Sequence, residues 1–549
     1  MSRRVLIIGL DGATFDVINP LMEEGWMPCL KRLIEKGAYG LLKSTVPPIS
    51  APAWLSLATG LKPEKTLVYD FGYRKDKRNY KLQSSSSSDY AGRAIWDYLG
   101  KAGKQVGILN YPMCIPPYEV NGFMSAGIWA SQDGEFTFPP DLKQELNKAA
   151  DGKYELTVDY HKIRYEDTGL FLDDLQKVLA KKLRAATYLL KEKQWDFFWL
   201  VISETDWLQH IMWRHIDESH PLYEGQNSKK LYQRFKKLWG LIDEAIGEFC
   251  GIVGEKTNLV ILSDHGFGPN DEVFKLNVWL EREGYLLWRK RQNKALNRIK
   301  ATVCAFGKAT AEGIKLHKLV PKLYGWGRAT KDKLIERIID RIDLERSIAF
   351  DPGHSMPFGG IYINDRIIHT PQNKEELIKE IAQKLCSWGN RNNAKVEIWQ
   401  RNNLPGDEAN TGPDLMVSIN DWRCVMPKGH LDGEIFERRP YSSRHTGSHR
   451  MNGIFIAAGP DIQRCAIDKV CIYDIAPTIL YLFDQPIPTN IDGQVFKDII
   501  TAEYLANHPV KLQTKSQDYK CTDESGAVKG LTAEDEDNIQ QQLKDLGYM

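Results

Sequence analysis

Short apolar runs recur along the chain, and polar residues follow most of them directly. Runs rich in Val, Ile, Leu and Phe occupy residues 5–10, 195–203, 258–262 and 453–458. The first run ends in Asp11 and a glycine. Continuous apolar runs of this length are typical of strands that are buried on both faces. The pattern therefore predicts buried parallel strands, each ending at a loop.

Longer stretches between these runs carry apolar residues at helical spacing. The clearest examples are Leu170–Lys193 and Lys229–Cys250. Strands that alternate with helices are typical of a doubly wound α/β fold, in which helices cover a mostly parallel sheet. We therefore expect this fold class, with a cap or helical segments inserted into it.

Composition divides the chain into parts. The segment 286–344 is rich in Lys and Arg, which predicts a basic helical insert that forms a cap or part of the surface. The main α/β domain would then comprise residues 1–285 and 345–500. Residues 501–549 form a polar C-terminal extension, with a last helix expected near Ala533–Leu546.

A run of serines at Ser84–Ser88 is followed by Asp89. Serine and aspartate are favoured in turns, because their side chains hydrogen-bond to nearby backbone groups. The run therefore predicts a surface loop.

Acidic and histidine side chains follow two of the predicted strands. Asp206 and His210 come directly after the second strand and are four residues apart, so a helix beginning there would place both on one face. Asp264 and His265 follow the third strand as neighbours. Because ligands bind at the carboxyl ends of strands in open α/β sheets, we expect these side chains to lie close together.

Two further residues extend this set. Asp11 follows the first strand, and His449 precedes the last one. Each motif alone is also compatible with a turn, a helix cap or an ordinary helix contact. Together, carboxylate oxygens and imidazole nitrogens suit Zn²⁺, Mn²⁺ or Fe²⁺ better than Mg²⁺ or Ca²⁺. The joint arrangement predicts a site for divalent metal ions, with zinc as the first choice.

Ser50 lies next to a predicted helix. Prolines precede it, and Ala53–Ala58 is expected to be helical with Pro52 in the first turn. A helix N-terminus favours negative charge. Ser50 is therefore either a helix cap or a nucleophile. Beside a metal site the second interpretation is favoured.

In their order along the chain, these motifs resemble the alkaline phosphatase superfamily, and most closely its type I phosphodiesterase/nucleotide pyrophosphatase branch. The similarity extends from Asp11 to about Gly493 and covers most of the chain apart from the basic insert and the tail. The stretches that carry it are Gly9–Gly12, Ser50–Pro63, Asp206 with His210, Ser263–Gly266, His449 and Tyr473–Leu480.

The resemblance implies two metal ions and a covalent intermediate. Ser50 would attack phosphorus in line and become phosphorylated or nucleotidylated, and water would then release the product. His445 is a reserve candidate for the second ion, four residues before His449. The ligands would be Asp11, Ser50, Asp264 and His265 for one ion and Asp206, His210 and His449 for the other.

The chain departs from the family pattern in two places. Many relatives use Thr where this chain has Ser50, and the hydroxyl chemistry is equivalent. Those enzymes also place an Asn about twenty residues later to hold a phosphoryl oxygen, and the stretch Val68–Phe71 lacks one. A formylglycine sulfatase requires Arg four residues after its modified residue. Trp54 at that position argues against this activity.

These features predict a metal-dependent phosphohydrolase that cleaves a phosphodiester or pyrophosphate bond of a nucleotide or small phosphorylated metabolite. Two alternatives within the superfamily stay open: a phosphomutase of the cofactor-independent phosphoglycerate type, which returns the phosphoryl group, and a phosphomonoesterase. A non-catalytic binding protein is disfavoured, because all proposed ligands and the nucleophile are present.

Composition narrows the classes of partner. In 549 residues, Lys and Arg number 73 and Asp and Glu 72, a net charge of +1, which argues against a dedicated nucleic-acid or membrane-surface binder.

The first apolar run is too short for a signal peptide, and no run is long enough to span a membrane. The nine cysteines form no CxxC pair, which is typical of reduced thiols. We therefore expect a cytoplasmic enzyme. Its exact substrate and oligomeric state stay open.

Overall fold

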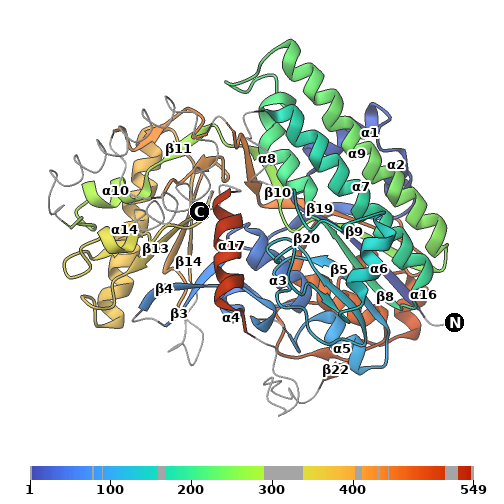
Figure 1. Ribbon diagram of the computed structural model, residues 1–549. Helices are drawn as coiled ribbons and strands as arrows, with labels where there is room; N and C mark the ends of the chain where they lie inside the picture. Colours follow the sequence, from blue (N-terminus) through green and yellow to red (C-terminus); the bar gives the residue numbers. More distant parts are fainter. Residues whose placement is uncertain are drawn as a thin grey trace.

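The computed structural model consists of a larger part built around one central sheet and a smaller part beside it (Figure 1). The smaller part lies on the left of the view, and the N-terminus lies at the far edge of the larger one. The residues that the structure describes are 3–76, 79–89, 91–158, 167–289, 338–355, 357–401, 411–428, 433–442, 444–513 and 530–545.

The central sheet has nine strands in the order β20-β2-β19-β9-β1-β8-β5-β6-β7. Neighbouring strands are parallel from β9 through β1, β8 and β5 to β6, and their side chains are almost entirely buried. The predicted α/β class with a mostly parallel sheet is therefore confirmed. The strand bounds are β1 (Arg4–Leu10), β2 (Ala38–Lys43), β5 (Val106–Tyr111), β6 (Gly122–Ala126), β7 (Thr137–Phe138), β8 (Phe197–Ile202), β9 (Thr257–Leu262), β19 (Asn452–Ala458) and β20 (Cys465–Cys471).

One strand runs against the predicted direction. The run at 453–458 forms β19, which is antiparallel to both β9 and β2. The direction of β19 follows from its connection to the strand that precedes it in the chain. A parallel strand must be entered through a crossover from the opposite edge of the sheet, whereas β19 directly follows the short strand β18 (Gly447–Arg450). Because β19 runs in the opposite direction to β9, its first residues lie at the same edge as the carboxyl ends of β1, β8 and β9.

The helices form two groups around this sheet. The long helices α7 and α9 pack against each other, and α8 and α2 pack against α9. Helices α3, α5 and α15 form the second group. The two long helices predicted from apolar spacing are confirmed as α7 and α9. The bounds are α2 (Pro28–Lys36), α3 (Ser50–Thr59), α5 (Ile95–Lys101), α7 (Thr168–Glu192), α8 (Glu204–Ile216), α9 (Gln226–Val253) and α15 (Ile475–Leu482).

The smaller part has a sheet and an apolar core of its own. Its antiparallel sheet has the order β12-β13-β15-β14, and α14 packs on it. Phe274, Trp279 and Trp388 belong to its separate apolar cluster. The bounds are β12 (Ala349–Phe350), β13 (Gly359–Ile363), β14 (Val396–Gln400), β15 (Leu415–Ile419) and α14 (Pro371–Asn392), with β11 (Glu272–Phe274), β16 (Cys424–Val425) and β17 (Phe436–Glu437) in a neighbouring three-stranded sheet.

The shorter elements complete the chain. Those with described bounds are α1 (Phe15–Glu23), α4 (Pro63–Thr66), α6 (Leu142–Ala149), α10 (Leu276–Arg282), α13 (Ile338–Arg341), α16 (Ala502–Asn507), α17 (Ala533–Asp545), β3 (Gly72–Asp76), β4 (Asn79–Ser84), β10 (Gly266–Pro269), β21 (Ile487–Pro488) and β22 (Leu512–Gln513).

The serine run does not form the predicted surface loop. Ser84–Ser87 are buried, and only the last serine of the run is exposed. The buried polar groups are satisfied by the carboxylate of Asp89, which accepts hydrogen bonds from Ser85 Oγ at 3.0 Å and from the Ser86 N–H at 2.8 Å, and by the Pro116 carbonyl, which accepts one from Ser87 Oγ at 2.6 Å. The local hydrogen bonds typical of serine and aspartate therefore occur here inside the protein.

Most of the predicted basic insert, residues 290–337, lies outside the described residues, and so do residues 514–529 of the C-terminal extension. The last helix predicted from the sequence is confirmed as α17. Among the helices of the described ranges, none is long and apolar enough to cross a membrane.

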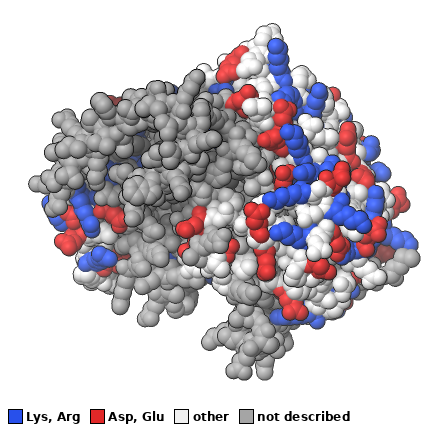
Figure 2. All heavy atoms as spheres, viewed as in Figure 1, with Lys and Arg blue, Asp and Glu red and all other residues white. Residues whose placement is uncertain are grey.

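Charged side chains of both signs are interspersed on the visible face over α7 and α9 (Figure 2). Several form surface pairs, such as Lys177 with Asp174 at 2.9 Å and Lys191 with Glu248 at 3.0 Å. The described part of this face therefore carries no large area of like charge, in keeping with the nearly equal numbers of acidic and basic residues.

Asp70 joins the two parts of the molecule. Its Oδ1 accepts a hydrogen bond from the Phe71 N–H at 2.8 Å, and its Oδ2 accepts one from the Ser355 N–H of the smaller part at 2.7 Å. Burial alone would raise the pKa of this carboxyl, but the neighbouring His354 and Lys428 and the Ser355 N–H hold it below its usual value. The carboxylate is therefore charged and fully used as an acceptor between the two parts.

Replacing Asp70 by alanine should lower the free energy of unfolding by about 1–3 kcal/mol, because two backbone donors lose their acceptor. Since the pKa is lowered in the folded protein, this contribution is present above the ordinary pKa of 3.8 and is lost as the pH falls through the lower folded-state value. Urea unfolding at neutral pH would measure it. Asp174→Ala, at an exposed pair, is the control and should change stability by less than about 0.5 kcal/mol. Equal midpoints for the two variants would contradict the prediction.

Candidate metal centre

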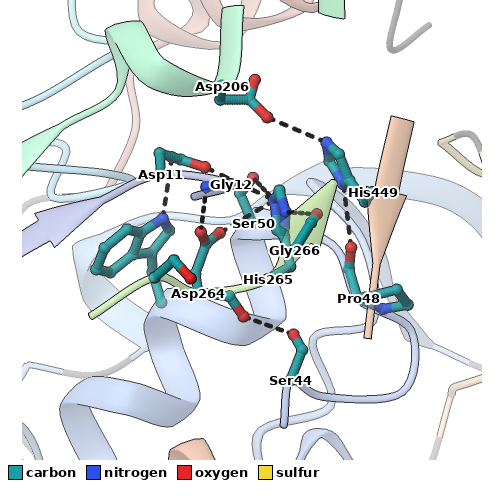
Figure 3. A network of polar contacts seen from close by, with 12 residues as sticks. Asp11, Gly12, Ser44, Pro48, Ser50, Asp206, Asp264, His265, Gly266 and His449 are labelled. Carbon is teal, nitrogen blue, oxygen red and sulfur yellow. Dashed lines mark hydrogen bonds and ion pairs between the residues drawn. The ribbon is translucent and has the colours of Figure 1, made fainter. Parts of the chain in front are cut away.

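The polar residues singled out in the sequence meet at one edge of the central sheet (Figure 3). Asp11 directly follows β1, Asp264 and His265 follow β9, and Asp206 lies in the first turn of α8, which follows β8. His449 lies on β18, just before β19. The antiparallel direction of β19 explains how a residue before a strand reaches residues that come after strands.

Asp206, His210 and His449 form one compact group. The Nε2 atoms of His210 and His449 are 3.2 Å apart. They lie 3.4 and 3.3 Å from the two carboxylate oxygens of Asp206. One potential ligand atom from each residue falls within a sphere suited to a single metal ion, and all three residues are buried.

Asp11, Asp264 and His265 form a second group of the same kind. His265 Nε2 lies 3.2 Å from Asp264 Oδ2 and 3.6 Å from Asp11 Oδ1. The two groups adjoin, because the rings of His265 and His449 stack with their centroids 3.7 Å apart. The structure therefore brings two candidate metal-binding groups into one centre.

Ser50 faces the second group. It is the first residue of α3, and its Oγ lies 3.1 Å from His265 Nε2. The N-cap position belongs to Ile49, and no side chain caps the helix. The two interpretations of Ser50 are thereby separated: its hydroxyl points to His265 and does not cap its own helix.

Backbone carbonyl oxygens orient all three imidazole rings. The Nδ1 atoms of His210, His449 and His265 lie 2.8, 3.0 and 3.1 Å from the carbonyl oxygens of Gly447, Pro48 and Gly266. A carbonyl oxygen only accepts, so each Nδ1 carries a proton, and in the neutral ring each Nε2 then keeps a lone pair. Fixing the tautomer in this way is characteristic of metal-binding histidines.

The carboxylates are held in a similar way. The indole N–H of Trp54 donates to Asp11 Oδ2 at 3.1 Å, and the Gly12 N–H donates to Asp264 Oδ1 at 3.1 Å. The other oxygens, Asp11 Oδ1 and Asp264 Oδ2, are buried and receive no hydrogen bond from the described residues. Buried acceptors without donors are costly unless a cation neutralises them, so this donor set fits a divalent metal ion.

The electrostatics of the centre support the same interpretation. Burial, with the nearby carboxylates of Asp264 and Asp206, raises the pKa of Asp11 well above its ordinary value, and burial also raises the pKa of Asp264. For Asp206, the rings of His210 and His449 in their protonated form outweigh burial and hold the pKa below its usual range. Burial lowers the pKa of His449 to about 3 and also lowers that of His210. Neutral imidazoles beside crowded carboxylates form a site whose charge a cation would balance.

Glycines give the backbone room beside Asp11. A Cβ on Gly9 would lie 2.5 Å from the Trp54 ring, and Gly12 has a φ of +67° with Phe267 close by. Bulkier residues at these positions would displace the indole that holds Asp11 or strain the loop. The glycines of Gly9–Gly12 therefore have a structural role in the site.

His445 lies beside the Asp206 group but is not part of it. The His445 ring lies 5.6 Å from the ring of His210, and the group found within the described residues contains His449 and not His445.

Sequence reasoning missed the role of Trp54, which it used only to argue against a sulfatase. Its position one helical turn after Ser50 is the signal that could have indicated that it faces the site.

The chain is similar to known proteins at the level of a family model and of solved structures. A family model described as type I phosphodiesterase/nucleotide pyrophosphatase matches residues 5–448. Among solved structures, human ectonucleotide pyrophosphatase/phosphodiesterase 5 is 13% identical with a TM-score of 0.46, covering 91% of this chain and 100% of its own. An inactive variant of the murine protein, in complex with AMP, has the same identity, coverage and TM-score. No curated protein sequence matches.

Proposed function

This chain is a hydrolase of the type I phosphodiesterase/nucleotide pyrophosphatase family, and from that premise we propose that it cleaves a phosphodiester or pyrophosphate bond in a small, nucleotide-like molecule. In this proposal Ser50 is the nucleophile of a two-metal centre. The observation that carries it is the position of Ser50 Oγ, buried at the start of α3 and 3.1 Å from His265 Nε2 between the candidate ligands.

The residues divide between two metal ions as follows. The Asp206 group would hold one ion, and the Asp11 group together with Ser50 would hold the other. Two bound divalent ions lower the pKa of a coordinated hydroxyl and stabilise charge on the attacking and leaving oxygens. Imidazole and carboxylate donors in this ratio favour zinc, and manganese or iron would also suit them.

The reaction itself uses the serine hydroxyl and its helix. Ser50 Oγ forms a bond to phosphorus as its proton passes to solvent, and the bond from phosphorus to the leaving oxygen breaks, with the electron pair and then a proton from solvent going to that oxygen. The N-terminus of α3 favours the negative charge of the phosphoryl group at this position. Water then attacks phosphorus, the bond to Ser50 Oγ breaks, and the hydroxyl is restored.

We also propose that the enzyme acts in the cytoplasm. The described cysteines are free thiols, as expected of a protein that folds in a reducing compartment. The substrate is proposed to be a soluble metabolite and not a nucleic acid, since the charge of the chain is balanced.

The purified protein should contain about two metal ions per chain and hydrolyse bis-p-nitrophenyl phosphate faster than p-nitrophenyl phosphate. Metal analysis and the release of p-nitrophenol, with Zn²⁺ or Mn²⁺ added, measure both. Faster cleavage of the monoester would identify a phosphatase instead. Bound metal with no hydrolysis of either compound would favour a mutase, and a protein that binds no metal would contradict the proposal.

A further inference from the structure

We propose that a buried ion pair between Lys182 and Glu204 positions Asp206, a candidate ligand of the second metal group. The inference rests on the proposed function, because it concerns how that metal centre is held in shape. Lys182 and Glu204 take no part in either metal group and touch none of the reacting atoms. They act through the first turn of α8.

The pair is short and enclosed. Lys182 Nζ lies 2.6 Å from Glu204 Oε1, and the two side chains are only 2% and 1% exposed. The same ammonium donates to the carbonyl oxygen of Leu156 at 2.8 Å and lies 5.9 Å from the centre of the Trp207 ring. One cation on α7 therefore contacts the residues on both sides of Asp206, at positions 204 and 207.

The first turn of α8 depends on such outside contacts. Ser203, its N-cap residue, makes no side-chain capping hydrogen bond. Toward β1, Thr205 donates to the Asp11 carbonyl at 2.7 Å, and Gln209 donates to the Gly12 carbonyl at 2.9 Å. These bonds fix the helix on its sheet side. The contact from Lys182 fixes it toward α7, so the turn that carries Asp206 is held from two directions.

The sequence itself marks Lys182 as unusual. It lies on the buried face of α7, at the helical spacing set by Val178, Leu179 and Ala186. An apolar residue would pack there without the desolvation of a charge, and buried ion pairs are on average weak contributors to stability. A charge retained at such a position is better explained by the geometry that it imposes than by the stability that it adds.

Loss of one partner would leave the other poorly satisfied. Neither carboxylate oxygen of Glu204 receives a hydrogen bond from the described residues, so the ion pair with Lys182 is what neutralises this carboxylate. Without the pair, the first turn of α8 can rotate or fray, and Asp206 moves relative to His210 and His449. The expected consequence is weaker binding at the Asp206 group, with the Asp11 group unaffected.

The test is a zinc titration of metal-free protein against a chelating indicator. The wild type should bind two ions, and Asp206→Asn should identify the step that belongs to the Asp206 group. Glu204→Gln should weaken that step about 10- to 100-fold, as loss of a supporting contact does at other metal sites, and should leave the other step unchanged.

The control is Glu24→Gln, which removes the charge from a pair of the same length, Lys236–Glu24 at 2.6 Å, between α9 and the end of α1, whose carboxylate is 42% exposed. It should change neither step. The double variant Lys182→Met with Glu204→Gln removes both charges together, so neither is left buried alone. It should show the same selective weakening as Glu204→Gln.

Wild-type affinity at both sites in Glu204→Gln or in the double variant would overturn the inference, and so would equal weakening of both steps. Unfolding curves of the metal-free proteins, recorded in parallel, separate a loss of fold from a loss of position. A wild type that binds no zinc would instead contradict the proposed function, so the two failures are distinguishable.

Discussion

Replacing Ser50 by alanine should reduce hydrolysis of the diester by at least about 10³-fold and leave the metal content close to two ions per chain. The large effect is expected because no other hydroxyl in either metal group can form the bond to phosphorus, and removal of a nucleophile costs orders of magnitude in turnover. Metal is retained because Asp11, Asp264 and His265 remain as ligands. Steady-state kinetics and metal analysis of the same preparation measure both results.

The matched control is Ser56→Ala. Ser56 is a second fully buried serine on α3, and its hydroxyl has no hydrogen-bond partner among the described residues. This variant should retain near wild-type activity. If Ser50→Ala kept more than about a tenth of the activity, the assignment of the nucleophile would be wrong.

The second large effect is expected when His449 is replaced, with its neighbour His445 as the comparison. His449→Ala should lose one of the two metal ions and at least about 10²-fold in activity, since even residues that only support a ligand contribute up to that factor. The reason is the position of His449 Nε2, 3.2 Å from His210 Nε2 and 3.3 Å from Asp206 Oδ1. Metal analysis and diester kinetics measure the loss.

His445→Ala provides the comparison. This ring lies near His210 but outside the compact group, so the variant should keep both ions and most of the activity. The reverse pattern, with metal lost only in His445→Ala, would show that the centre rearranges around the other histidine when it binds metal.

Much of the central sheet could be predicted because its signal is local. The strands β1, β8 and β9 are continuous apolar runs, and α7 and α9 repeat their apolar residues at helical spacing over many turns. The direction of β19 could not be predicted in this way. It depends on the connection from β18, and the composition of the strand itself carries no information about direction.

The same distinction applies to the site. Asp264 and His265 could be predicted because they follow an apolar strand in the same way as Asp11 and Asp206 do, and this repetition is visible in the sequence. The atoms that orient the site are harder to find. Every residue has a backbone carbonyl oxygen, so the sequence does not distinguish those of Pro48 and Gly447. Only the fold brings these two oxygens to the imidazoles. The burial of Ser85 likewise depends on Asp89 and on the elements around it.

The antiparallel entry of β19 has a consequence for the order in which the protein is made. The two histidines of the Asp206 group are 239 residues apart in the chain, so this site cannot close until synthesis has passed His449. Contacts between such distant residues form late and slowly. Until then, the growing polypeptide carries Asp206 and His210 without their third partner. The centre therefore becomes competent to take up its full metal content only after His449 has been synthesised and has folded into place beside them.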